Sequence, residues 1–200
     1  MKAKATWFAL LLIASALVIT GCNLTGGNPG DDWATFENPV YGYSFKYPVG
    51  CFIGPMPSDC KEKPPEERNP ECLCFLNSED PNDVYLQAYL GEGDQLSLAG
   101  FRISHHATPL YHPPADAELI EWVGNNFMDI LEDIPEDPNM KISGVQAVRI
   151  YAPGSPMATS YEEIYFIRDG SLMRINLIDV GDVEKRALYE QMLSTFKLEE

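Results

Sequence analysis

The side chains that could do chemistry in this sequence are its histidines, its cysteines and its clusters of carboxylates. The three histidines are His105, His106 and His112. On a strand, His105 and His106 point to opposite faces, so they cannot easily share one metal ion. A site built with Tyr111 and nearby carboxylates is the alternative, and surface histidines at a strand end are the interpretation we favour. We therefore expect no histidine ligand to a metal.

Other catalytic patterns are missing from the sequence. It contains no Gly-x-Ser-x-Gly elbow, no His-Glu-x-x-His pair and no complete glycine-rich phosphate loop. Two acidic runs, at residues 79–83 and 129–137, could attract calcium, but neither has the spacing or the turn glycine of an EF-hand. A solvated loop and a solvated helix face explain them better. We predict no catalytic residue, no metal site and no cofactor.

The amino-terminal segment has the pattern of a lipoprotein signal peptide. Lys2 and Lys4 precede an apolar stretch at 7–19, which is shorter than the roughly 20 helical residues that span a bilayer. Residues 18–22, Val-Ile-Thr-Gly-Cys, resemble a bacterial lipobox, in which the cysteine thiol accepts the lipid. The alternative is a membrane helix that happens to contain a cysteine. We predict a signal peptide at 1–21 and acyl chains such as palmitate on Cys22. They would anchor the protein outside the cytoplasm, on the cell membrane or the outer membrane.

Once Cys22 is assigned to lipid, four cysteines are left: Cys51, Cys60, Cys72 and Cys74. An even number outside the cytoplasm favours two disulfides, with three possible connectivities. Cys72 and Cys74 lie on the same face of a predicted strand and are not expected to bond each other, so Cys51 and Cys60 would each pair with one of them. A four-cysteine zinc site is the alternative, but the usual Cys-x2-Cys spacing is missing. We predict a cysteine-stapled loop at 51–74.

Charge narrows the class of partner. The chain has 14 basic and 30 acidic residues; without Lys2 and Lys4, twelve basic residues are left and the net charge is −18. Such a field repels nucleic acid and anionic lipid headgroups, so the covalent lipid would be the membrane attachment. Residues 22–32 have several helix and strand breakers and read as a flexible tether. Residues 33–200 are long enough for one domain with its own core.

Alternating apolar residues predict strands along most of that domain. A hairpin is expected at 35–47 and further strands at 72–76, 84–90 and 96–104, then at 140–143, 145–151, 161–167 and 172–178. The dipeptide Asp169-Gly170 predicts a tight turn. Apolar residues at three- and four-residue steps predict two main helices, at about 118–133 and 182–195. We expect an α+β fold with one mainly antiparallel sheet and helices packed on it.

Four segments resemble PsbP-like domains, named for an extrinsic photosystem II protein. They are residues 41–48 (Tyr-Gly-Tyr-Ser-Phe-Lys-Tyr-Pro), 145–150, the hairpin 165–175 and residues 194–198. The resemblance implies an α-β-α sandwich and a role in binding or assembly. Members include photosystem subunits, a Ran-binding import factor and bacterial lipoproteins without an assigned activity. The cysteine-bearing stretch 51–74 departs from the family pattern.

These observations lead to one expected function and two alternatives. We expect a membrane-anchored, extracytoplasmic lipoprotein that acts as a non-enzymatic binding or assembly module and holds a protein partner. A carrier of a small ligand or divalent cation is the alternative, motivated by the acidic charge. A hydrolase is a more remote alternative, because only the presence of Ser, His and Asp residues speaks for it.

Overall fold

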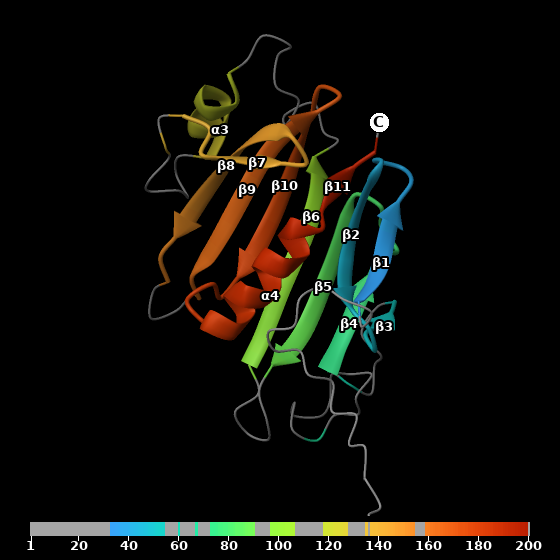
Figure 1. Ribbon diagram of the computed structural model, residues 1–200. Helices are drawn as coiled ribbons and strands as arrows, with labels where there is room; N and C mark the ends of the chain where they lie inside the picture. The colour runs from blue at the N-terminus through green and yellow to red at the C-terminus, as the bar shows by residue number, and fades with distance from the viewer. Residues whose placement is uncertain are drawn as a thin grey trace, which may run out of the picture.

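The computed structural model describes residues 33–54, 60, 67, 73–90, 97–106, 118–127, 135, 137–154 and 159–199. In these residues the chain forms two helices and two sheets (Figure 1). The strands, in chain order, are β1 (Trp33–Asn38), β2 (Tyr43–Pro48), β3 (Phe52–Ile53), β4 (Cys74–Asn77), β5 (Asp83–Leu90), β6 (Ser97–His106), β7 (Met140–Ile142), β8 (Val145–Ala152), β9 (Tyr161–Arg168), β10 (Ser171–Ile178) and β11 (Lys197–Leu198). The helices are α3 (Leu119–Phe127) and α4 (Val183–Ser194).

The larger sheet has eight strands in the order β3-β4-β5-β6-β10-β9-β8-β7. All its pairs are antiparallel except β3 with β4, which run parallel. The smaller sheet has the order β1-β2-β11, so the carboxyl-terminal strand pairs with the first hairpin. Figure 1 shows the small sheet and α4 in front of the large sheet, with α3 at its other end.

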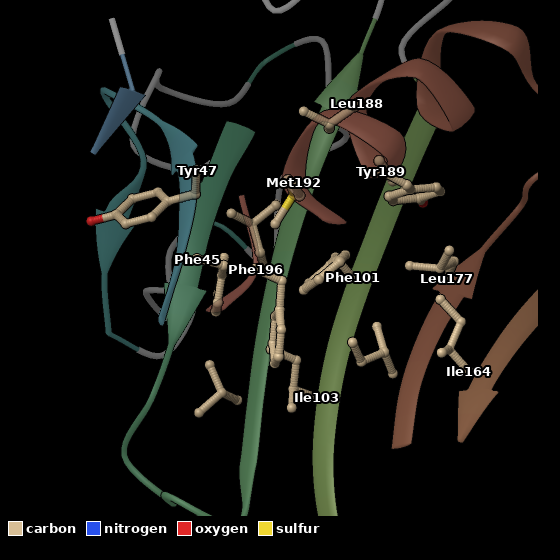
Figure 2. Packing of buried hydrophobic residues seen from close by; sticks show 14 of the residues in the cluster. Phe45, Tyr47, Phe101, Ile103, Ile164, Leu177, Leu188, Tyr189, Met192 and Phe196 are labelled. Carbon is tan, nitrogen blue, oxygen red and sulfur yellow. The ribbon is translucent and has the colours of Figure 1, made fainter. Parts of the chain in front are cut away.

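The main core lies between the large sheet, the small sheet and α4. Alternate residues of β5, β6 and β10 face this core because side chains on a strand alternate between its two faces. Phe101 of β6 lies at its centre, 5.4 Å in ring-centroid distance from Phe45 of β2. Figure 2 shows both rings, with Met192 and Phe196 in the same cluster. The apolar side of the first hairpin is therefore buried against the face of the large sheet.

A second, smaller core lies on the opposite face of the large sheet. Val123 of α3 packs there with Val148 and Ile150 of β8 and with Tyr165 of β9. The main contacts of α3 within the described residues are with β8 and β9, so it covers one part of that face. Neither helix of the described part of the chain has the length and apolarity needed to cross a membrane.

The expected fold class is wrong. The chain is not an α+β domain, nor an α-β-α sandwich with two main helices, because a three-stranded and an eight-stranded sheet dominate the described residues. The physical reason lies in the first hairpin, which was expected to extend the single sheet. Tyr43, Phe45 and Tyr47 of β2 are all buried. They shield part of the face of the large sheet from water, so that part is covered by a second sheet and not by a helix.

Several predictions of local structure are confirmed. The hairpin of β1 and β2 pairs in an antiparallel register, Phe36 opposite Phe45. Asp169 and Gly170 have φ values of 51° and 75°, the left-handed conformation that a two-residue hairpin turn requires. The predicted helix at 182–195 is observed as α4, and Asp182 caps it by accepting hydrogen bonds from the amides of Glu184 and Lys185.

The hydroxyl of Tyr189 ties α4 to the large sheet. It accepts a hydrogen bond from the amide of Gly100, at 2.8 Å, and donates one to the carbonyl of Ile178. We expect Tyr189→Phe to lower the free energy of unfolding by about 1–3 kcal/mol, because the buried amide of Gly100 and the partly buried carbonyl of Ile178 lose their side-chain partner. Urea denaturation measures the change. Tyr151→Phe is the matched control, since Tyr151 is 48% exposed; equal effects of the two substitutions would contradict the prediction.

Three buried tyrosines make the fold sensitive to alkaline pH. Burial raises the pKa of Tyr43, Tyr165 and Tyr189, and the Glu163 carboxylate raises the pKa of Tyr165 further. When the folded-state pKa of a tyrosine lies above the unfolded value of about 10, the protonated tyrosine contributes its full stabilisation below about pH 10. This stability is lost as the pH rises toward the folded-state pKa. We expect tyrosinate absorbance from these residues to appear together with the loss of circular dichroism. Ionisation of every tyrosine with the sheet intact would contradict this.

Candidate functional site

A pocket of about 460 Å³ lies at one end of the molecule, between two hairpin turns. We call it the hairpin pocket. Residues 39–42, from the turn between β1 and β2, form one side, and Arg168, Asp169 and Ser171, from the turn between β9 and β10, form the other. His105 and the buried Met173 complete the lining. This volume is within the range of about 300–1,000 Å³ that small-molecule sites occupy.

Asn38 shapes the first wall of the pocket. Its Oδ1 accepts hydrogen bonds from the amides of Val40 and Tyr41, at 3.1 and 3.2 Å, while its Nδ2 donates to the hydroxyl of Tyr43 and the carbonyl of Pro81. The side chain is 3% exposed. An asparagine that bonds the backbone two residues on is a turn former, so this residue fixes the turn from inside.

Tyr41 and His105 form an aromatic wall of the pocket. Their ring centroids lie 3.8 Å apart with an angle of 21° between the planes, which is a stacked arrangement. The hydroxyl of Tyr41 donates to Oδ1 of Asn82. The backbone amide of His105 donates to the carbonyl of Asn82, at 2.8 Å. The Tyr41 hydroxyl and the backbone of His105 therefore both tie this wall to the turn before β5.

Arg168 joins the second wall to the first. Its Nη1 donates to the carbonyl of Gly42 at 2.8 Å, its Nη2 donates to the carbonyl of Glu199, and its Nε lies 3.3 Å from a carboxylate oxygen of Asp169. Gly42 has a φ of 55°, and a Cβ there would lie 3.1 Å from Nη2 of Arg168. A glycine is needed at this position for both reasons. The guanidinium therefore holds the two turns that form the pocket together.

Two buried carboxylates outside the hairpin pocket already have hydrogen-bond partners within the fold. Glu162 faces α4 and accepts hydrogen bonds from Arg149 and Arg186. Glu163 points to the opposite face and accepts a hydrogen bond from the hydroxyl of Tyr165. Because each carboxylate is held by partners in the fold, we assign both to stability and not to acid–base chemistry.

The β3 edge of the large sheet is the second candidate surface. Cys51, next to β3, forms a disulfide with Cys74 of β4. Val49, Phe52 and Ile53 surround Cys51 in the chain and are 46%, 37% and 62% exposed. We call these three residues the edge patch. The disulfide holds the patch against the sheet while its apolar side chains face solvent.

The structure tests part of the cysteine prediction. Cys51 pairs with one of the two cysteines expected for it, namely Cys74. Cys60 is disulfide-bonded as well. Cys22 and Cys72 lie outside the described residues. Lipidation of Cys22 stays a prediction.

The other candidate residues are placed as follows. His105 lies next to the last residue of β6 and stacks on Tyr41, whereas the side chain of His106 and all of His112 lie outside the described residues. Of the acidic run 79–83, Asp80 accepts hydrogen bonds from Asn82 and Asp83 forms an ion pair with Arg102. Most of the run 129–137 lies outside the described residues. In the part of the chain that the structure describes, no three His, Cys, Asp or Glu side chains gather as metal ligands would.

Sequence reasoning did not find the hairpin pocket. It predicted only a hairpin at 35–47 and a tight turn at Asp169-Gly170, and Arg168 entered only as part of the hairpin motif 165–175. The signal that was present is the pair of turns flanked by polar and aromatic residues, Asn38 to Tyr41 and Arg168 to Ser171. Nothing in local periodicity shows that the two turns meet at one end of the fold.

Comparisons with known proteins leave the family open. No family model matches the chain, and no curated protein matches it. A crystal structure from Bacteroides thetaiotaomicron VPI-5482 is similar, at 14% identity and a TM-score of 0.45, over 84% of this chain and 49% of that one. The chain thus spans about half the length of that protein. A similarity of this degree carries no inference about function.

Proposed function

We propose that the chain is a lipid-anchored, extracytoplasmic binding module that holds a protein partner at the β3 edge of its large sheet. The observation that carries this proposal is the edge patch. Large apolar side chains are normally buried, and single exposed ones need no explanation, but Val49, Phe52 and Ile53 gather within five residues around a disulfide. The disulfide keeps these apolar side chains exposed to water, and this arrangement is useful if a partner protein covers them.

The backbone of β3 supports the same surface. Among the described residues, β3 is the last strand on its side of the eight-stranded sheet. One side of its backbone pairs with β4, and no described strand pairs with the other side, which can accept an added strand. Because β3 has only two residues, side-chain contacts with the patch would supply most of the affinity. The proposed occupant is an extended protein segment with apolar side chains.

The net charge of the chain indicates which charged residues should flank the apolar residues of that segment. With a formal net charge of −16, or −18 after removal of the signal peptide, the protein repels acidic partners and attracts basic ones. We propose that the partner segment carries Lys or Arg next to its apolar residues. The resemblance to PsbP-like domains supports a role in binding or assembly, and membership of that family stays a prediction.

Crosslinking of the full chain in its native membrane tests the partner site. We expect Phe52→Lys combined with Ile53→Lys to reduce the yield of the specific adduct at least tenfold, because two charges replace the apolar contact. Val183→Lys is the matched control, since Val183 is exposed by 82% but lies on α4. If the double variant gives the wild-type adduct, or if the wild type gives no specific adduct, the proposal is wrong.

Lipidation is tested separately. We expect Cys22→Ala to abolish labelling with palmitate and to move the protein from the membrane fraction to the soluble fraction, since the chain has no other predicted attachment. Persistence of the unlabelled variant in washed membranes would show a different anchor. This outcome is independent of the partner site, because the edge patch is far from Cys22 in the sequence.

A further inference from the structure

We infer that the hairpin pocket binds a neutral, polyhydroxylated ligand, namely a mono- or disaccharide unit. The inference uses residues that the proposed partner site does not involve, and either can be true without the other. Three properties of the pocket lead to this ligand class: its charge, its aromatic wall and its supply of polar groups.

The charges around the pocket disfavour ions. Arg168 and Asp169 both line the pocket, and their opposite charges lie 3.3 Å apart, so together they give the lining no net charge that would attract an ion. The formal net charge of −16 on the whole chain disfavours anions that approach from solution. A neutral ligand needs no unpaired charge in the lining, so it is the class that the paired Arg168 and Asp169 suit best.

The walls of the pocket combine aromatic and apolar surface. The stacked rings of Tyr41 and His105 lie next to Val40 and Met173. A sugar ring has one face of C–H groups, and such a face packs well against aromatic and aliphatic side chains while its hydroxyls point elsewhere. Binding sites of this kind are mostly apolar, with a few polar groups that fix the orientation of the ligand.

The polar groups match the hydroxyls of a sugar. Ser171 can donate and accept, Asp169 is an acceptor with a side chain 89% exposed, and the Arg168 guanidinium has more N–H donors than its three hydrogen bonds use. Arg168 and Asn38 already hold the two turns in place. A preformed pocket loses little conformational entropy on binding, which raises its affinity for a ligand of matching shape.

Nuclear magnetic resonance of the full chain in detergent tests the site without any substitution. The probes are glucose, N-acetylglucosamine and lactose, with glucuronate and glucosamine as anionic and cationic counterparts. We expect at least one neutral sugar to shift the amide signals of Gly42, His105 and Ser171 and to leave that of Val183 unchanged. The charged sugars should bind at least tenfold more weakly. The inference is overturned if no neutral sugar binds, if a charged sugar binds as well, or if the shifts lie elsewhere.

Two variants test the walls separately. We expect His105→Ala and Ser171→Ala each to weaken binding of the neutral sugar roughly tenfold. Val183→Ala serves as the surface control. Phe52→Lys, in the edge patch, should bind the sugar like the wild type, which separates this inference from the proposed function. Thermal melting shows whether each variant is folded, and if His105→Ala is not, Ser171→Ala and the signal shifts decide. Wild-type affinity in the folded variants would overturn the site.

Discussion

Replacing Phe101 with alanine is expected to lower the free energy of unfolding by about 3–5 kcal/mol, because a large ring at the centre of the core leaves a cavity that its neighbours fill only in part. Phe101 is 1% exposed and packs against Phe45 of the small sheet. It therefore supports the contact between the large sheet and the first hairpin. Urea denaturation, followed by far-ultraviolet circular dichroism, measures the loss.

The control for this prediction is Val183→Ala. Val183 begins α4 and is 82% exposed, so its truncation should change the free energy of unfolding by no more than about 0.5 kcal/mol. A loss below about 1 kcal/mol for Phe101→Ala would show that the two sheets do not depend on each other as the packing in Figure 2 indicates.

Removal of the disulfide between Cys51 and Cys74 should have the next largest effect. The two cysteines are 23 residues apart, and opening a loop of this length gives the unfolded chain additional conformational entropy worth roughly 3 kcal/mol. We therefore expect the double variant Cys51→Ala, Cys74→Ala to unfold at a clearly lower urea concentration than the wild type, with both measured without reductant.

A second measurement locates the effect at the sheet edge. Limited proteolysis should cut the double variant near Phe52 and Ile53 faster than the wild type, because β3 then has only its short pairing with β4 to hold it. Reductant alone is a poor substitute for the variant, since it also reduces the disulfide of Cys60. Identical urea midpoints for the variant and the wild type would contradict the prediction.

The strands of the large sheet could be predicted because their information is local. In β5 every second residue is buried, from Val84 to Leu90, and the sequence shows this as plain alternation. The turn at Asp169 and Gly170 is predictable for a similar reason, since its residue types match the backbone angles of a two-residue turn. Each of these predictions needs only a few neighbouring residues.

The arrangement of the sheets could not be predicted in this way. Alternation in β2 shows that one side of the hairpin is apolar, but the same pattern suits a strand inside a sheet and a hairpin lying on its face. The pairing of Ser44 with Lys197 decides between them, and it joins opposite ends of the sequence. Phe52 and Ile53 were also missed as a strand, because two residues show no period.

The candidate site depends on distant contacts even more strongly. Gly42, Arg168 and Glu199 meet at the hairpin pocket, and no short window of the sequence contains two of them. Sequence reasoning could find the hairpin at 35–47 and the turn at 169–170, and it could not show that the two lie together. The region of the edge patch was predicted more closely. The cysteine-stapled loop was expected, and Cys51 was expected to pair with one of two cysteines, of which Cys74 is the one observed.

The closing strand β11 has a consequence for the order in which the chain folds. The small sheet is complete only when Lys197 and Leu198 pair with Ser44 and Tyr43, and the amide of Lys46 also bonds to Thr195, 149 residues away. Contacts between residues so far apart in the sequence raise the contact order and slow folding. A chain that crosses a membrane amino end first would expose its first hairpin, with Tyr43, Phe45 and Tyr47 uncovered, until residues 195–198 arrive. During that interval the hairpin would be the segment most in need of a chaperone.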